Sequence, residues 1–147
     1  MIVRLPGDLD KRIREHAAAG YPDEACGLLS GIRKGDTVKV TGVHESHNIT
    51  DRDPKTGFEI DPKLRFDLMR ALEERADGTE IIGHYHSHPD HPAEPSATDL
   101  SMTYETEFIW LICAVTADGE TELNAFKPLE DRSRFDRLAL EIGQRLE

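Results

Sequence analysis

An apolar segment of this chain runs directly into two histidines that are separated by one residue. The segment Glu80–His86 reads E-I-I-G-H-Y-H and is followed by Ser87, His88 and Pro89. Its short length and apolar content are typical of a β-strand, and Pro89 ends the strand because proline lacks the backbone donor. Residues i and i+2 of a strand point to the same face. His86 and His88 are therefore expected to project together.

A carboxylate follows at a spacing that suits a third metal ligand. Asp99 lies eleven residues after His88, beyond a loop that contains three prolines and ends at Pro95. Ser96 opens a short helix, so Asp99 lies one turn into that helix, where the helix dipole favours an anion. Two imidazoles, one carboxylate and an open fourth position are a common donor set of catalytic zinc. We therefore expect one Zn²⁺ per chain at His86, His88 and Asp99, with a bound water.

Simpler interpretations of the same residues stay open. A histidine pair two residues apart often arises by coincidence, and Ser96 and Asp99 also fit a capping box that needs no metal. His84 shares the strand face, but its Cα would lie about 13 Å from that of His88, so three histidines on one ion would be strained. His91 lies beyond Pro89 and could reach the mouth of the site, but we expect it to be a flexible surface residue instead. The other histidines are expected to be structural: His16, His44 and His47.

A zinc hydrolase also needs a general base, preferably a carboxylate that does not bind the metal. Zinc lowers the pKa of its bound water to near neutral and so creates a nucleophile. Glu24 is our candidate for the base, because it stands directly before the apolar strand expected at Ala25–Ser30. On the residues alone, however, Glu24 is only one of 29 acidic residues.

The apolar pattern predicts a mixed order of strands and helices. Helices are expected at about 8–19, after an N-cap at Asp61, from Ser96, and along the apolar positions Phe135, Leu138, Ile142 and Leu146. Strands are expected at 25–30, 37–44, 80–86, 108–116 and 121–126, the last two joined by an Asp118-Gly119 hairpin. This order indicates a single α/β (α+β) domain over residues 1–147, with a mixed sheet.

Charge and composition exclude several functions. The formal net charge is −11, and no lysine or arginine run offers the basic patch that nucleic-acid binding requires. No window approaches the roughly 20 apolar residues of a membrane span, and no signal peptide is visible, so we expect a cytoplasmic protein. Cys26 and Cys113 lie in apolar runs without a CxxC neighbour and are expected to be free, buried thiols. A zinc deaminase would need a Pro-Cys-x-x-Cys motif, which is absent.

Together, these residues resemble the motif of the JAMM (MPN+) zinc metalloprotease family. That motif is a Glu, then His-Ser-His, seven residues, Ser, two residues and Asp; here these positions are Glu24, His86-Ser87-His88, Ser96 and Asp99. The segments Glu24–Gly31 and Phe58–Pro62 are also similar to the small prokaryotic JAB-type members. The resemblance extends from about Leu5 to Leu129.

The resemblance implies a fold, a set of residue roles and a class of substrate. The fold would be a curved, mixed MPN/JAMM-like sheet flanked by helices, with a cytidine-deaminase-like architecture. His86, His88 and Asp99 would bind zinc, Glu24 would carry the proton from water to the leaving amine, and Ser96 would donate a hydrogen bond to the oxyanion. The enzyme would hydrolyse peptide or isopeptide bonds after the C-terminal Gly-Gly of a ubiquitin-like or sulfur-carrier protein.

Two alternatives within the same fold are weighed against this interpretation. A catalytically inactive MPN-type scaffold would have lost ligands, whereas this chain keeps all five motif positions. A DNA-repair-associated member conflicts with the net charge of −11. Two positions depart from the usual pattern: His84, where relatives commonly carry an aromatic or aliphatic residue, and Ala25.

Overall fold

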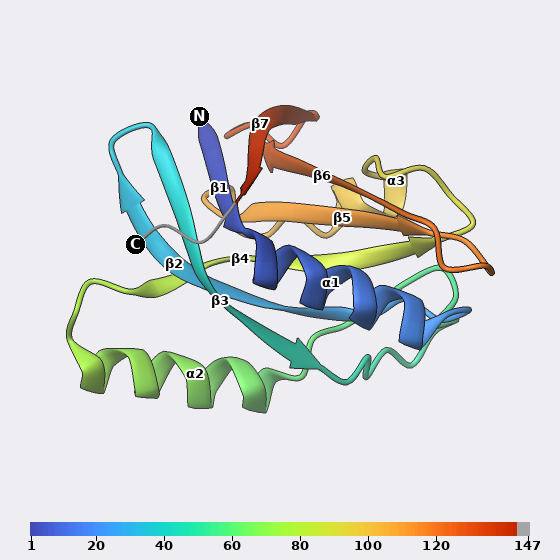
Figure 1. The fold of residues 1–147 in the computed structure, drawn as a ribbon, viewed down its shortest axis with the longest axis horizontal. Coiled ribbons are helices and arrows are strands. Elements are labelled where there is room, and N and C mark those ends of the chain that lie inside the picture. The colour runs from blue at the N-terminus through green and yellow to red at the C-terminus, as the bar shows by residue number, and fades with distance from the viewer. Residues whose placement is uncertain (144–147) are drawn as a thin grey trace.

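The computed structural model describes residues 1–143, which form seven strands and three helices (Figure 1). The helices are α1 Gly7–Gly20, α2 Pro62–Arg75 and α3 Ala97–Ser101. The strands are β1 Ile2–Pro6, β2 Cys26–Lys34, β3 Thr37–Ser46, β4 Glu80–Pro89, β5 Ile109–Val115, β6 Thr121–Pro128 and β7 Phe135–Gly143.

The strands form one mixed sheet that closes on itself in the order β1-β3-β2-β4-β5-β6-β7. β1 pairs in parallel with both β3 and β7, and β4 pairs in parallel with β5. The remaining neighbours are antiparallel. The predicted mixed α+β class is therefore confirmed, whereas the closure of the sheet is a feature that the sequence did not indicate. The cytidine-deaminase-like architecture stays a prediction.

The two longer helices relate to the sheet differently. α1 lies across the strands and buries Leu9, Ile13 and Ala17 in the main core, together with inward-facing residues of several strands (Figure 1). α2 lies along the outside of the molecule and buries only Leu72 (Figure 1). The core therefore sits between α1 and the sheet, and it supports β4 and β5 from one face.

The structure corrects the predicted C-terminal helix. Phe135, Leu138 and Ile142 belong to strand β7, and Leu146 lies outside the described residues. Within β7, Leu138 and Leu140 are half-buried at a spacing of two residues and pack against the core, whereas Ile142 is exposed. The helical spacing was misleading because β7 is held on both sides by pairing with β6 and β1. β1 was also missed, since five residues give too little pattern to identify a strand.

The other expected elements are present with shifted ends. β2 continues past the predicted end at Ser30 to Lys34, through an irregularity in its register with both neighbouring strands. The Asp61 side chain caps α2 by accepting a hydrogen bond from the Lys63 amide, as the sequence predicted. The β5–β6 hairpin is confirmed, with Gly119 at φ +87°. Among the described residues, no helix combines the length and the apolar character needed to cross a bilayer.

Candidate metal centre

His86 and His88 extend from β4, which pairs with β2 on one side and with β5 on the other. His86 is aligned with Cys26 on one side and Ile112 on the other, and His88 is aligned with Ala114. The two imidazoles are buried, with exposed fractions of 0% and 6%. A strand hydrogen-bonded on both sides has little freedom, so the spacing of the two rings is fixed by the sheet.

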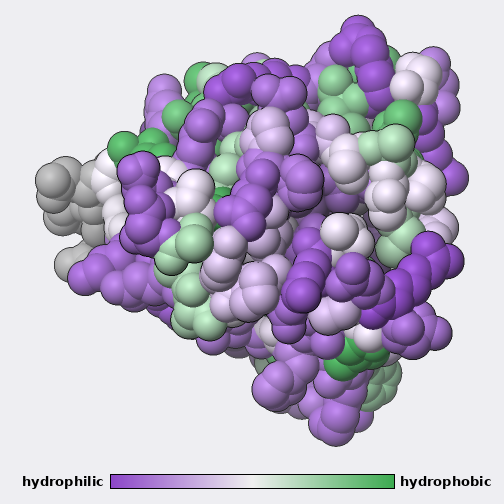
Figure 2. Space-filling model, turned by 90° about the vertical axis from the view of Figure 1, so that its right-hand side faces the viewer, coloured by the Kyte–Doolittle hydropathy of each residue, from purple (hydrophilic) through white to green (hydrophobic). Residues whose placement is uncertain are grey.

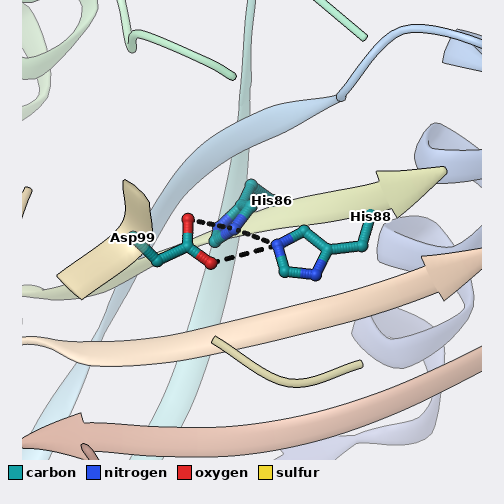
Figure 3. Close-up of side chains that lie close together, drawn as sticks. All are labelled: His86, His88 and Asp99. Carbon is teal, nitrogen blue, oxygen red and sulfur yellow. Dashed lines mark hydrogen bonds and ion pairs between the residues drawn. The ribbon is translucent and has the colours of Figure 1, made fainter. Parts of the chain in front are cut away.

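Asp99 reaches the same point from the first turn of α3 (Figure 3). Its Oδ2 accepts a hydrogen bond from the Ser96 amide at 2.9 Å, and its own amide donates to Ser96 Oγ at 3.0 Å. The predicted capping box is therefore present. It orients the carboxylate toward the two rings, with Oδ1 3.2 Å from His86 Nε2 and Oδ2 3.1 Å from His88 Nε2.

These three side chains fit a divalent metal ion. The Nε2 atoms of His86 and His88 are 3.1 Å apart, and one ligand atom from each of the three residues lies within 4.8 Å of the others. Tetrahedral zinc with bonds of about 2.0–2.1 Å would separate its ligands by about 3.3 Å, close to the observed spacing. Asp99 is 5% exposed, so an acidic group is buried beside two imidazoles. The donor set of nitrogen and oxygen atoms is one that zinc accepts.

The hydrogen bond made by His88 Nδ1 also supports metal binding by these three side chains. His88 Nδ1 lies 2.9 Å from the carbonyl oxygen of Pro92, which can only accept a hydrogen bond. Nδ1 therefore carries the proton, and Nε2 offers its lone pair to the centre. Among residues 1–143, His86 has no such partner: its Nδ1 is buried without a hydrogen bond, and its ring stacks on Phe58 at 4.3 Å. Aromatic packing, rather than a hydrogen bond, holds the His86 ring.

Burial and mutual charge set the protonation of the three groups. Burial raises the pKa of Asp99, but the charges and hydrogen bonds of His86 and His88 outweigh it and hold that pKa below its usual value. Burial lowers the pKa of His86. Burial also lowers the pKa of His88, yet the hydrogen bonds to Asp99 and Pro92, together with the charges of Asp99 and Glu24, raise it by more. An ionised carboxylate beside imidazoles is the form that binds a cation.

Glu24 lies just before β2 with its side chain 7% exposed. It lines a cavity of about 370 Å³ together with His88 and Ser96. Its backbone is anchored twice: its amide donates to Pro54 O at 2.7 Å, and its carbonyl accepts from Asn48 Nδ2 at 3.1 Å. Burial raises the pKa of Glu24 to about 8, while His88 lowers it and Asp99 raises it. The five residues predicted for the site are thus brought around one centre and its adjoining cavity.

Two residues to which the sequence assigned no role position Glu24. Ser87 Oγ accepts a hydrogen bond from the Ala25 amide at 2.8 Å, and the Ser87 amide donates to Ala25 O at 2.9 Å. Asn48 bridges the Glu24 carbonyl and the Gly57 carbonyl through its amide nitrogen. Ser87 could have been suspected from its place between the two histidines, whereas nothing in the sequence distinguishes Asn48 from other loop residues.

The remaining histidines and both cysteines lie outside the metal centre. His84 packs edge-on against Trp110 with ring centroids 4.3 Å apart, and burial, followed by the charge of His86, lowers its pKa to about 3. His16 and His44 form hydrogen bonds with the hydroxyls of Tyr85 and Ser30, in line with the structural role expected for them. His91 is exposed beside the Glu24 cavity. The two cysteines are buried and free, as predicted: Cys26 and Cys113.

Comparison with known proteins identifies the family. The family described as prokaryotic homologs of the JAB domain matches residues 6–128. A desampylase from Haloferax volcanii is 36% identical over 101 residues, which cover 69% of each chain. A CysO-cysteine peptidase from Mycobacterium tuberculosis is 27% identical over 126 residues, which cover 86% of this chain and 82% of that protein.

A solved structure agrees with these sequence matches. The solution structure of protein DSY2949 from Desulfitobacterium hafniense has a TM-score of 0.79 at 30% identity, covering 100% of this chain and 96% of that one. The two curated relatives are named for enzymatic activities, so the predicted hydrolase class is confirmed. With its own His86, His88 and Asp99 gathered at one point, this chain belongs to the prokaryotic JAB-domain family.

Proposed function

We propose that this protein is a zinc-dependent isopeptidase or peptidase that hydrolyses the bond after the C-terminal Gly-Gly of a ubiquitin-like or sulfur-carrier protein. One observation carries the proposal: His86, His88 and Asp99 converge within 4.8 Å, and the cavity beside them is lined by both Glu24 and Ser96. Metal ligands, a base and a hydrogen-bond donor are the parts that amide hydrolysis requires.

His86, His88 and Asp99 would hold one zinc ion in this chain. When bound, zinc supplies a Lewis acid that lowers the pKa of the attacking water and polarises the substrate carbonyl. Burial of these three side chains strengthens their attraction for the ion, because electrostatic interactions are stronger where water is excluded. The bond from His88 Nδ1 to Pro92 O keeps Nε2 directed toward His86 and Asp99.

Glu24 would move the proton. Hydrolysis joins the oxygen of water to the carbonyl carbon and breaks the carbon–nitrogen bond, so one proton must pass from the water to the departing amine. A carboxyl group with its pKa raised by burial to about 8 can both accept that proton and release it near neutral pH. The two backbone anchors of Glu24 hold it beside His88 while it does so.

Ser96 would stabilise the charge that develops on the carbonyl oxygen. Its Oγ accepts the Asp99 amide hydrogen bond through a lone pair, which leaves the O–H proton available. Ser96 is exposed and lines the same cavity as Glu24, so the hydroxyl can reach a substrate there. A donor fixed in place before the reaction favours the transition state over the ground state.

The names of the relatives support a protein conjugate as the substrate. They include a desampylase, a CysO-cysteine peptidase and a probable TtuB-protein conjugate cleaving protease. A ubiquitin-like or sulfur-carrier protein is therefore the partner we propose. The net charge of −11 argues against a nucleic-acid partner.

The proposal is tested by metal content and cleavage in parallel. The purified chain should contain one zinc per molecule and should cleave a Gly-Gly conjugate of a ubiquitin-like carrier, while Glu24→Gln should keep its zinc and lose cleavage. A zinc-loaded protein that cleaves no such conjugate, with no difference from Glu24→Gln, would contradict the proposal. A chain that binds no zinc would instead be the inactive scaffold of this fold.

A further inference from the structure

The carbonyl group that orients His88 belongs to a loop rich in proline. Pro92, whose carbonyl oxygen accepts from His88 Nδ1 at 2.9 Å, lies between the end of β4 and the start of α3. β4 points toward the end of the molecule where this loop lies (Figure 1), and Figure 2 shows that hydrophilic side chains predominate on that face. Proline has no backbone N–H, so Pro92 and Pro95 cannot donate hydrogen bonds that would hold the loop. The position of the Pro92 carbonyl therefore depends on contacts that other parts of the chain make with this loop.

Asn124 on β6 supplies such a contact. Its side-chain nitrogen donates a hydrogen bond at 3.0 Å to the carbonyl oxygen of Ala93, the residue directly after Pro92. Ala93 is 2% exposed and Asn124 is 8% exposed, so this bond is shielded from water. Within the described part of the chain, only two side chains form hydrogen bonds with the backbone of residues 91–95: His88 at Pro92 and Asn124 at Ala93. Asn124 therefore ties this part of the loop to the sheet.

The partners of Asn124 fix the orientation of its amide. Arg137 of β7 donates to Asn124 Oδ1 at 2.6 Å, and Asn124 Nδ2 also donates to Glu122 Oε2 at 3.3 Å. A guanidinium group can only donate, whereas carbonyl and carboxylate oxygens can only accept, so a flip of the amide would break all three bonds. The nitrogen therefore faces Ala93, while the oxygen is held by a charged donor, which forms the stronger class of hydrogen bond.

Asn124 stands among apolar residues on the face of the sheet that carries the metal centre. It is aligned with Ile112 of β5, which is itself aligned with His86. Residues directly opposite each other on neighbouring strands project from the same face. Ile112 and Phe126 belong to a buried apolar cluster, so burial of an amide beside them costs free energy unless its hydrogen bonds are made. Packing alone would favour an apolar side chain at this position, and the amide is explained by its contact with the loop.

We propose that Asn124 is a positioning residue of the metal centre. By holding the Ala93 carbonyl, it keeps the neighbouring Pro92 peptide in the place where its carbonyl accepts from His88 Nδ1. That hydrogen bond directs the opposite nitrogen of the ring, Nε2, toward the other two ligands. Loss of a group that orients a metal ligand from outside lowers metal affinity by about 10–100-fold. Asn124 acts one step further out, through the loop, so we expect an effect of about tenfold. The inference rests on the zinc site of the proposed function.

Zinc affinity, measured on the full chain by competition with a chelator, tests this role apart from catalysis. Asn124→Leu keeps the branching of the side chain in its apolar surroundings but removes the donor, and it should weaken zinc binding about tenfold. Asn124→Asp is a second variant, which carries the test if the first fails to fold. Its carboxylate can accept from Arg137 but cannot donate to the Ala93 carbonyl. It should also weaken zinc binding, although the added negative charge by itself would favour a cation.

Leu123→Ala is the matched control for a general loss of stability. Leu123 is the neighbour of Asn124 on β6, points to the opposite face and is buried in the main core. This variant should lower the melting temperature but keep the zinc affinity of the parent chain. An unchanged zinc affinity in either Asn124 variant, or an equal loss in Leu123→Ala, would overturn the inference and leave the proposed function intact. A parent chain that binds no zinc would remove both.

Discussion

Replacing Ser96 with alanine tests its two roles together, and each role has its own readout: stability for the helix cap and turnover for the oxyanion donor. The lone pair of Oγ accepts the Asp99 amide at 3.0 Å and caps α3. The O–H proton is the part that we assign to the reaction. Ser96→Ala removes both, but it keeps the backbone amide that donates to Asp99 Oδ2 at 2.9 Å. Asp99 therefore retains its orientation toward His86 and His88.

The expected magnitudes follow from these contacts. Loss of a serine N-cap costs roughly 0.5–2 kcal/mol in the free energy of unfolding. The cost should fall in the lower part of that range, because α3 is only five residues long and Ser96 is exposed. Loss of one preorganised oxyanion donor lowers turnover by about 10²–10³-fold. Zinc content should stay the same, since no metal-binding atom is removed.

The assay combines zinc analysis, thermal unfolding and kcat on a Gly-Gly conjugate. Ser96→Thr is the matched control, since threonine also caps helices and keeps the O–H donor. Threonine should restore both stability and most of the turnover. If Ser96→Ala lowers only the unfolding temperature and leaves kcat unchanged, the hydroxyl is a helix cap alone, and the oxyanion role is wrong.

Further predictions concern the ligands, the support of the base and the packing of β4. His88→Ala should lose zinc and cleavage together, and a chelator that lowers the melting temperature of the parent chain should not change that of the variant, because only a protein with bound metal gains stability from it. Ser87→Ala should keep zinc but lower kcat. It should also destabilise the fold by about 1–3 kcal/mol, since the buried Ala25 amide loses its acceptor. An unchanged kcat would show that Ser87 does not position Glu24. Gly83→Ala should unfold at a clearly lower denaturant concentration than the parent chain, because a Cβ there would collide with the Ile109 carbonyl of β5; a stability equal to that of the parent chain would contradict the tight β4–β5 packing.

The parts of the fold that could be predicted from the sequence are those fixed by local chemistry. The Asp61 cap, the Ser96–Asp99 capping box and the Gly119 hairpin each depend on a few neighbouring residues. The three candidate ligands could be predicted equally well, because strand geometry places His86 and His88 on one face and the capping box orients Asp99. In all of these cases the residue types themselves specify the geometry.

The features that escaped prediction depend on partners far along the chain. β7 is a strand because β6 and β1 supply its hydrogen bonds, and β1 is joined to it only when the sheet closes. The apolar spacing of Phe135, Leu138 and Ile142 fits a helix equally well when it is considered without those partners. Pairing with distant strands makes this segment a strand, and no local sequence pattern indicates that pairing.

The position of Glu24, the candidate base, depends both on local strand geometry and on a contact between segments far apart in the sequence. Successive residues of a strand alternate in direction, so Ser87 must point away from the face that His86 and His88 share. Its hydroxyl oxygen accepts from the Ala25 amide and its own amide donates to the Ala25 carbonyl, so both groups bind the residue next to Glu24. The residue between the two ligands thus ties Ala25, the neighbour of the candidate base, to the metal centre across 62 positions of sequence. A change at Ser87 should therefore move Glu24 without touching a ligand, which is why loss of turnover with retention of zinc is the informative result for that variant.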